Sequence, residues 1–117
     1  MKIILDDHVY GMRITLIVGQ KHADKYMAKY GTRTEAHHNA EMNIFYRENE
    51  LVIYLQEFEW RICDMTTLAH ECFHAALRVL DYIGHNIGDI EGTEPTAYYF
   101  QWMYTELMKK LNKRIKP

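Results

Sequence analysis

The sequence predicts a single α+β domain, residues 1–117, in which a small sheet comes first along the chain and two long helices follow. The length of 117 residues allows one hydrophobic core and is too short for two. The first half contains short runs rich in β-branched residues, and the second half contains long stretches with apolar residues at helical spacing. Apolar residues make up 48% and charged residues 26% of the chain, as in ordinary soluble globular proteins.

Two strands are expected near the N-terminus. Residues 2–5 form a short apolar run, residues 9–18 are rich in β-branched side chains, and an Asp-Asp pair between them is a turn signal. A helix is expected over residues 20–30, where apolar residues recur at helical spacing. Gly31 is suited to end this helix in a left-handed conformation.

A second pair of strands is expected over residues 40–47 and 51–58. The second of these segments begins as a continuous apolar run. In the first, two sets of side chains alternate along the strand: Met42, Ile44 and Tyr46 on one side and Glu41, Asn43 and Phe45 on the other. Only three residues separate the two segments, and the middle one, Asn49, readily adopts a positive φ. This connection predicts an antiparallel hairpin, so the sheet of about four strands is antiparallel or mixed.

The first long helix is expected over residues 65–83. Asp64 or Thr66 can cap its N-terminus, and Gly84 lies just beyond its end. Its apolar side chains fall on one stripe that is expected to be buried: Leu68, Cys72, Ala75, Ala76, Val79 and Ile83.

The second long helix is expected to begin at a cap, Thr93 or Glu94, and to end near residue 111. Pro95 is compatible with a first helical turn, and the basic residues at the far end suit the helix dipole. Together with the shorter helix over residues 20–30, the two long helices are expected to cover one face of the sheet.

The strongest functional signal lies inside the first long helix. The segment His70-Glu71-Cys72-Phe73-His74 has the pattern His-Glu-x-x-His. Side chains four residues apart lie one turn apart on the same face of a helix, so both imidazoles can bind one metal ion. Glu71 is displaced to one side, from where it can reach a water bound to that ion without being a ligand.

A hydrolytic zinc site uses three protein ligands and leaves a fourth position for water. His85, Asp89, Glu91 and Glu94 are available after the motif. Glu94 is favoured because it opens a helix that must pack against the first one, so its carboxylate can project across the gap. Nineteen residues then separate His74 from this third ligand.

This pattern resembles the gluzincin branch of the zincin metallopeptidases, in which a second helix supplies a glutamate ligand, with the same nineteen-residue gap in thermolysin-like enzymes. The segment Glu94-Pro95-Thr96-Ala97-Tyr98 also resembles small phage and prophage metallopeptidases of about this length. The resemblance covers residues 66–104. It implies a minimal zincin-like domain with the motif on its central long helix, one zinc ion held by the two histidines and Glu94, and Glu71 as the general base.

The chain departs from that family at one position close to the expected ligands. Thermolysin-like enzymes have an aspartate four residues after the glutamate ligand, which orients a zinc-bound histidine, whereas this sequence has Tyr98. The Tyr98 hydroxyl, one turn after Glu94, is a candidate donor to the reaction's oxyanion or to a ligand histidine. His85 is the other candidate, so these two residues join Glu71 as candidate catalytic residues.

These observations predict a zinc-dependent metallopeptidase that hydrolyses a peptide or amide bond with metal-activated water. Its partner would be a protein or peptide substrate, added as a strand at a sheet edge beside the metal helix, and either strand of the hairpin, 40–47 or 51–58, could supply that edge. Hydrolysis of a non-peptide amide would use the same residues.

The alternative is a catalytically silent binding or inhibitor module that zinc stabilises, of a kind that a phage could encode. A structural zinc site is closed by a fourth protein ligand, and Asp89, Glu91 or His85 could close this one.

Charge and composition exclude several other classes. The formal net charge of −2 gives no basic surplus, so no nucleic-acid partner is expected. The N-terminus becomes acidic too soon for a secretory signal, and no apolar run approaches the roughly 18 residues of a membrane span. Cys63 and Cys72 are too few for a thiolate zinc site. A cytoplasmic protein, in the host cytoplasm if phage-encoded, is therefore expected, with no membrane partner.

Overall fold

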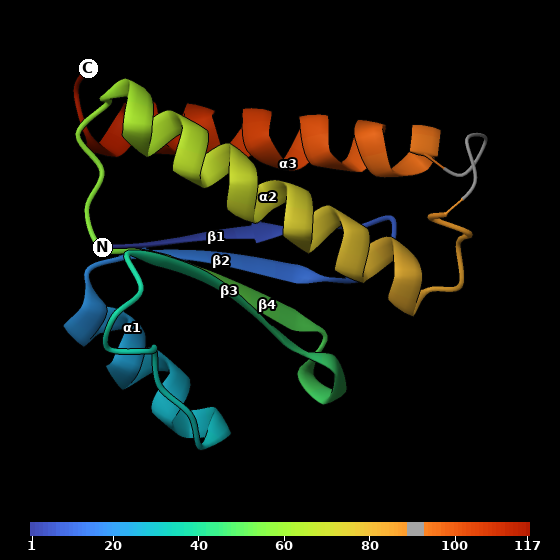
Figure 1. Ribbon diagram of the computed structural model, residues 1–117, viewed down its shortest axis with the longest axis horizontal. Coiled ribbons are helices and arrows are strands. Elements are labelled where there is room, and N and C mark those ends of the chain that lie inside the picture. Colours follow the sequence, from blue (N-terminus) through green and yellow to red (C-terminus); the bar gives the residue numbers. More distant parts are fainter. Residues whose placement is uncertain (89–92) are drawn as a thin grey trace.

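Within residues 1–88 and 93–117, which the computed structural model describes, a four-stranded mixed sheet lies between helices on both of its faces (Figure 1). Short 3₁₀ turns follow the first helix and the third strand. The α+β class, the sheet of about four strands and the three helices are confirmed. The elements in chain order are β1 (Lys2–Asp6), β2 (Arg13–Val18), α1 (Gln20–Met27), β3 (Ala40–Phe45), β4 (Glu50–Leu55), α2 (Ile62–Tyr82) and α3 (Thr93–Arg114).

The strand order in the sheet is β1-β2-β4-β3. β1 and β2 pair antiparallel, β2 and β4 pair parallel, and β3 and β4 form the antiparallel hairpin that the sequence predicts. Asn49 has a φ of 50° in the hairpin turn, which is the left-handed conformation expected there. The parallel pair arises because the chain leaves β2, crosses through α1 and β3, and returns as β4 beside β2.

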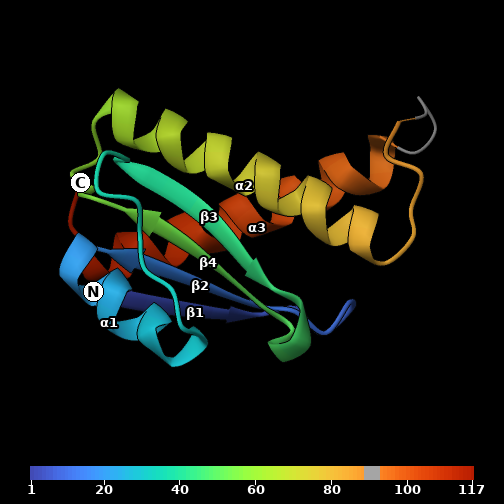
Figure 2. The ribbon, with the colours of Figure 1, turned by 60° about the horizontal axis from the view of Figure 1, so that its bottom comes forward.

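The helices divide between the two faces of the sheet, so the expectation that all three cover one face is wrong (Figures 1 and 2). All six residues of β4, an inner strand of the sheet, are buried. A strand that is buried on both faces must be covered on both sides, which helices on a single face of the sheet could not do. α2 and α3 contribute to the larger hydrophobic core on one face. On the other face, α1 completes a smaller core of Ile17, Ala23, Met27, Val52 and Tyr54.

The second strand begins at Arg13, four residues later than predicted, because the preceding segment forms a turn. Asp7 organises this turn: its Oδ1 atom accepts hydrogen bonds from the backbone amides of Val9 at 2.8 Å and Tyr10 at 3.1 Å. Its Oδ2 atom accepts a hydrogen bond from the Tyr99 hydroxyl at 2.8 Å. The buried Asp7 carboxylate thereby ties the β1–β2 turn to α3.

The helix that carries the motif begins at Ile62, and Arg61 is its N-cap in place of the predicted Asp64 or Thr66. Asp64 acts from the third helical position, where its Oδ2 atom accepts hydrogen bonds from the backbone amides of Glu59 at 2.8 Å and Arg61 at 3.1 Å. The side-chain hydrogen bond from Arg61 is the main reason why the pKa of Asp64 lies below its usual value. These bonds satisfy amides at the helix entrance and fix where α2 starts.

The two long helices run side by side in opposite directions over the sheet (Figure 1). The Phe73 and Phe100 rings meet with centroids 6.2 Å apart, and the Tyr104 hydroxyl donates to the Met65 carbonyl at 3.3 Å. Gly84, with a φ of 91°, follows α2 as predicted. Of the helices in the described ranges, none combines the length and apolar character needed to cross a membrane.

Candidate metal centre

The middle of α2 brings the two motif histidines together on an exposed side of the helix. His70 and His74 lie one turn apart, and their ring centroids are 4.6 Å apart with the ring planes at 73°. Their Nε2 atoms are 3.1 Å apart. The sequence predicts this convergence from helical geometry alone, and the structure confirms it.

The distance between the two nitrogens is close to the one that a tetrahedral zinc ion requires. With Zn–N distances of roughly 2.0–2.1 Å and a tetrahedral angle, two ligand nitrogens are about 3.3 Å apart. The 3.1 Å separation of the His70 and His74 Nε2 atoms fits that value. The same distance also allows a direct hydrogen bond, in which one imidazole N–H donates to the lone pair of the other. Metal content distinguishes these two interpretations.

Glu71 lies between the histidines in sequence and is half-buried. Burial raises the pKa of the Glu71 carboxyl, and the charges of His70 and His74 act in the opposite direction. The charges of Glu41, on β3, and His38 also reach this carboxyl. Glu71 is therefore in the electrostatic neighbourhood of both the histidine pair and the edge strand.

The opposite side of α2 holds the motif in place through apolar packing. Five of the six stripe residues are fully buried, and the exception is Ile83, which lies just past the helix and is 38% exposed. Leu80 is buried in addition. Burial raises the pKa of the Cys72 thiol to about 12, so this cysteine stays a neutral core residue. Because the core fixes this side of the helix, the histidines are directed away from it.

The predicted third ligand, Glu94, lies exposed in the first turn of α3. Asp89 and Glu91 lie outside the described residues. Among residues 1–88 and 93–117, no three or more side chains of His, Cys, Asp or Glu are gathered as a metal site would need. The structure thus brings together His70 and His74, and the assignment of Glu94 stays a prediction.

The two other candidate catalytic residues lie around the β1–β2 turn. Tyr98 is 67% exposed and lines a hollow of about 480 Å³ together with Pro95, Trp102 and residues of that turn. His85, exposed after the end of α2, meets the Tyr10 ring edge-on with centroids 6.3 Å apart. Their catalytic roles stay predictions.

A polar contact near the motif, between His38 and Glu41, was missed by sequence reasoning. The Nδ1 atom of His38 lies 3.3 Å from the Oε1 atom of Glu41. A loop histidine and a strand glutamate three residues apart carry no periodic signal, so the sequence offered no pattern that predicts this contact.

Comparisons of the chain with family models, with curated proteins and with solved structures found no match.

Proposed function

We propose that this protein is a zinc-dependent metallopeptidase of the gluzincin type. The observation that carries the proposal is the pair of imidazole nitrogens 3.1 Å apart, within a His-Glu-x-x-His segment on the exposed side of a helix. His70, His74 and Glu94 are the proposed ligands of one zinc ion, and Glu71 is the proposed general base.

The proposed roles follow from the positions of these side chains. Bound zinc would lower the pKa of a coordinated water towards about 7 and polarise the substrate carbonyl. Glu71, adjacent to the ligands, would take a proton from water and deliver it to the leaving amine. Tyr98 and His85 are the proposed donors to the oxyanion.

The sheet supports a peptide as the substrate. Of the hairpin strands, β4 lies inside the sheet between β2 and β3, so β3 is the one at an edge. α2 packs along β3, and within the described residues β4 is the strand that pairs with it. An extended peptide could therefore add to β3 beside the motif helix. A non-peptide amide would have no use for this edge.

Zinc content tests the ligand assignment. Purified protein reconstituted with zinc and dialysed should hold about one ion per chain by elemental analysis, and His74→Ala should hold none. His37→Ala, which removes an exposed loop histidine, is the matched control and should keep the ion. Because apolar packing holds α2, His74→Ala should remain folded by circular dichroism. Full zinc content in His74→Ala would refute the site.

Two further variants test the third ligand. Glu94→Ala should weaken zinc binding by more than the roughly 10- to 100-fold that loss of an outer-shell partner causes, because it removes a direct ligand. Glu91→Ala should leave the affinity within about twofold of the original. Competition with a chromogenic chelator measures both. The reverse order would move the assignment to Glu91, and no change in either would leave the site without a glutamate ligand.

A further inference from the structure

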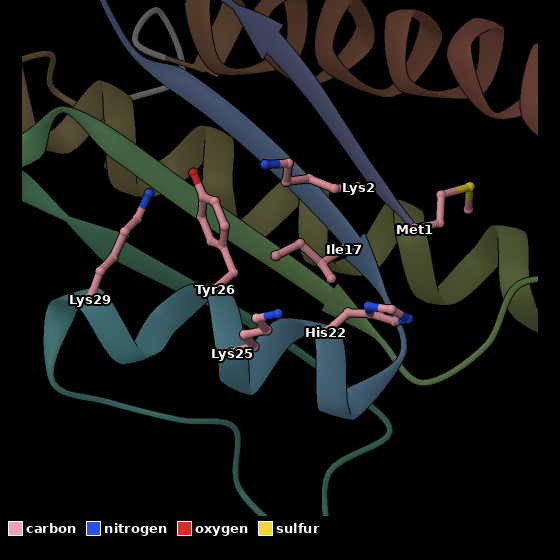
Figure 3. A pocket seen from close by; sticks show the side chains of 7 residues that line it. All are labelled: Met1, Lys2, Ile17, His22, Lys25, Tyr26 and Lys29. Atoms are coloured by element: carbon pink, nitrogen blue, oxygen red, sulfur yellow. The ribbon is translucent and has the colours of Figure 1, made fainter.

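The face of the sheet that carries α1 is only partly covered. α1 contacts β2 and β4, and β1 lies beyond it at the sheet edge. Between β1 and α1 is a hollow of about 480 Å³, which is in the size range of small-molecule sites (Figure 3). Its lining residues are Met1, Lys2, Ile17, His22, Lys25, Tyr26 and Lys29.

Basic side chains from three elements surround this hollow. Lys2 comes from β1, His22 and Lys25 come from α1, and Lys29 comes from the 3₁₀ turn after it (Figure 3). Three lysines among seven lining residues are a marked concentration of positive charge in a chain whose net charge is −2. The hollow is therefore a local region of positive potential.

Two of these cations lack a counter-charge among the residues that the structure describes. The Lys29 ammonium is 3.8 Å from Glu50 Oε1 and is thereby compensated. Among the described residues, Lys2 and Lys25 form no ion pair. Placing like charges close together costs free energy. The dipole of α1 does not explain the position of Lys2, because Lys2 comes from a strand.

The floor of the hollow is apolar and held in place. Ile17 is 1% exposed and belongs to the smaller core. The Tyr26 ring has the Lys29 ammonium 3.7 Å and the Lys2 ammonium 5.0 Å from its centroid. Its hydroxyl donates to Glu50 at 2.5 Å, which fixes the ring. Ile17 and the Tyr26 ring are thus held in place before a ligand binds, and this arrangement suits a ligand with an apolar body and a charged group.

We propose that this hollow binds a small phosphomonoester, with its phosphate between Lys2 and Lys25 and its apolar body against the Tyr26 ring. Two uncompensated ammonium groups match the charge of about −1.5 to −2 that a phosphomonoester carries at neutral pH. A carboxylate would neutralise only one of them. The hollow lies across the sheet from α2, so this site is independent of the proposed metal centre.

Titration with phenyl phosphate, followed by backbone amide chemical shifts, tests the proposal. Saturable shifts are expected at residues 22–26, and the double variant Lys2→Gln/Lys25→Gln should weaken binding about tenfold or more. Lys21→Gln is the matched control, because this lysine lies one turn before Lys25 on α1 but does not line the hollow. It should bind phenyl phosphate as the original chain does.

Two outcomes of this titration would contradict the proposal. Equal weakening by Lys21→Gln would mean diffuse charge attraction, and the absence of saturable shifts would mean no site. Inorganic phosphate should bind more weakly than phenyl phosphate, because it has no apolar body to contact the Tyr26 ring. Equal affinities for phenyl phosphate and inorganic phosphate would contradict the proposal that the ligand has an apolar organic body. Thermal unfolding of each variant checks that these exposed lysines leave the fold intact, and Glu71→Gln should bind the probe unchanged.

Discussion

Glu71→Gln should leave zinc bound and reduce peptide hydrolysis by about 10²- to 10⁴-fold, the usual contribution of a general base. Glutamine keeps the size and polarity of the side chain but cannot take a proton from water. The two imidazoles one turn apart do not depend on this carboxylate for their positions, so zinc content should stay the same. Cleavage of a peptide mixture, followed by mass spectrometry, measures the effect.

The matched control for this experiment is Asp81→Asn, which removes an exposed carboxylate from the far end of the same helix. It should retain both zinc and activity. Activity equal to that of the original chain in zinc-loaded Glu71→Gln would rule out the general-base role. Zinc-loaded original chain that cleaves no peptide in the mixture would instead favour the catalytically silent binding module.

Glu50→Ala should lower the free energy of unfolding by about 2–4 kcal/mol, because it removes the common acceptor of a buried network. Glu50 is 3% exposed. Its Oε2 atom accepts from the hydroxyls of Thr15 at 2.6 Å and Tyr26 at 2.5 Å, and its Oε1 atom accepts from Tyr30. Lys29 adds a cation at 3.8 Å. Denaturant unfolding measures the loss, and a change below about 1 kcal/mol would show that this network is not important for stability.

The same network makes part of the stability pH-dependent. Burial by itself raises the pKa of Glu50, but the three hydroxyl donors and the Lys29 charge outweigh it, so the pKa is lowered from its ordinary value of 4.5. A lowered pKa in the folded state means that the stabilisation is complete above pH 4.5 and is lost as the pH falls through the folded-state pKa. Glu50→Gln cannot titrate, so its stability should change less than that of the original chain in this acidic range.

Local signals predict the elements of this fold well. Gly31 and Gly84 have the positive φ angles expected after helices, and Asn49 has the one expected in the hairpin turn. The pairing of β2 with β4 could not be predicted in the same way, because it joins segments far apart in sequence. The expectation of three helices on one face does not take account of the uninterrupted apolar run from Leu51 to Leu55. Such a run indicates a strand buried on both faces, since a strand with one solvent-exposed face would alternate.

The same contrast between local and long-range signals applies to the candidate site. The meeting of His70 and His74 follows from the period of a single helix, so the sequence is sufficient to predict it. A third ligand from α3 depends on how two helices pack and on the path of the loop between them. Neither is encoded in a local period, so Glu94 and Glu91 could be ranked but not decided.

The hydrogen bond between Asp7 and Tyr99 spans 92 positions along the chain, and α3 packs over β1. During synthesis, β1 leaves the ribosome long before α3 exists. The apolar side of β1, with Ile3 and Leu5, therefore has no cover until translation has nearly reached the end of α3. A nascent chain stalled within α3 would present this strand to chaperones or to other unfinished chains.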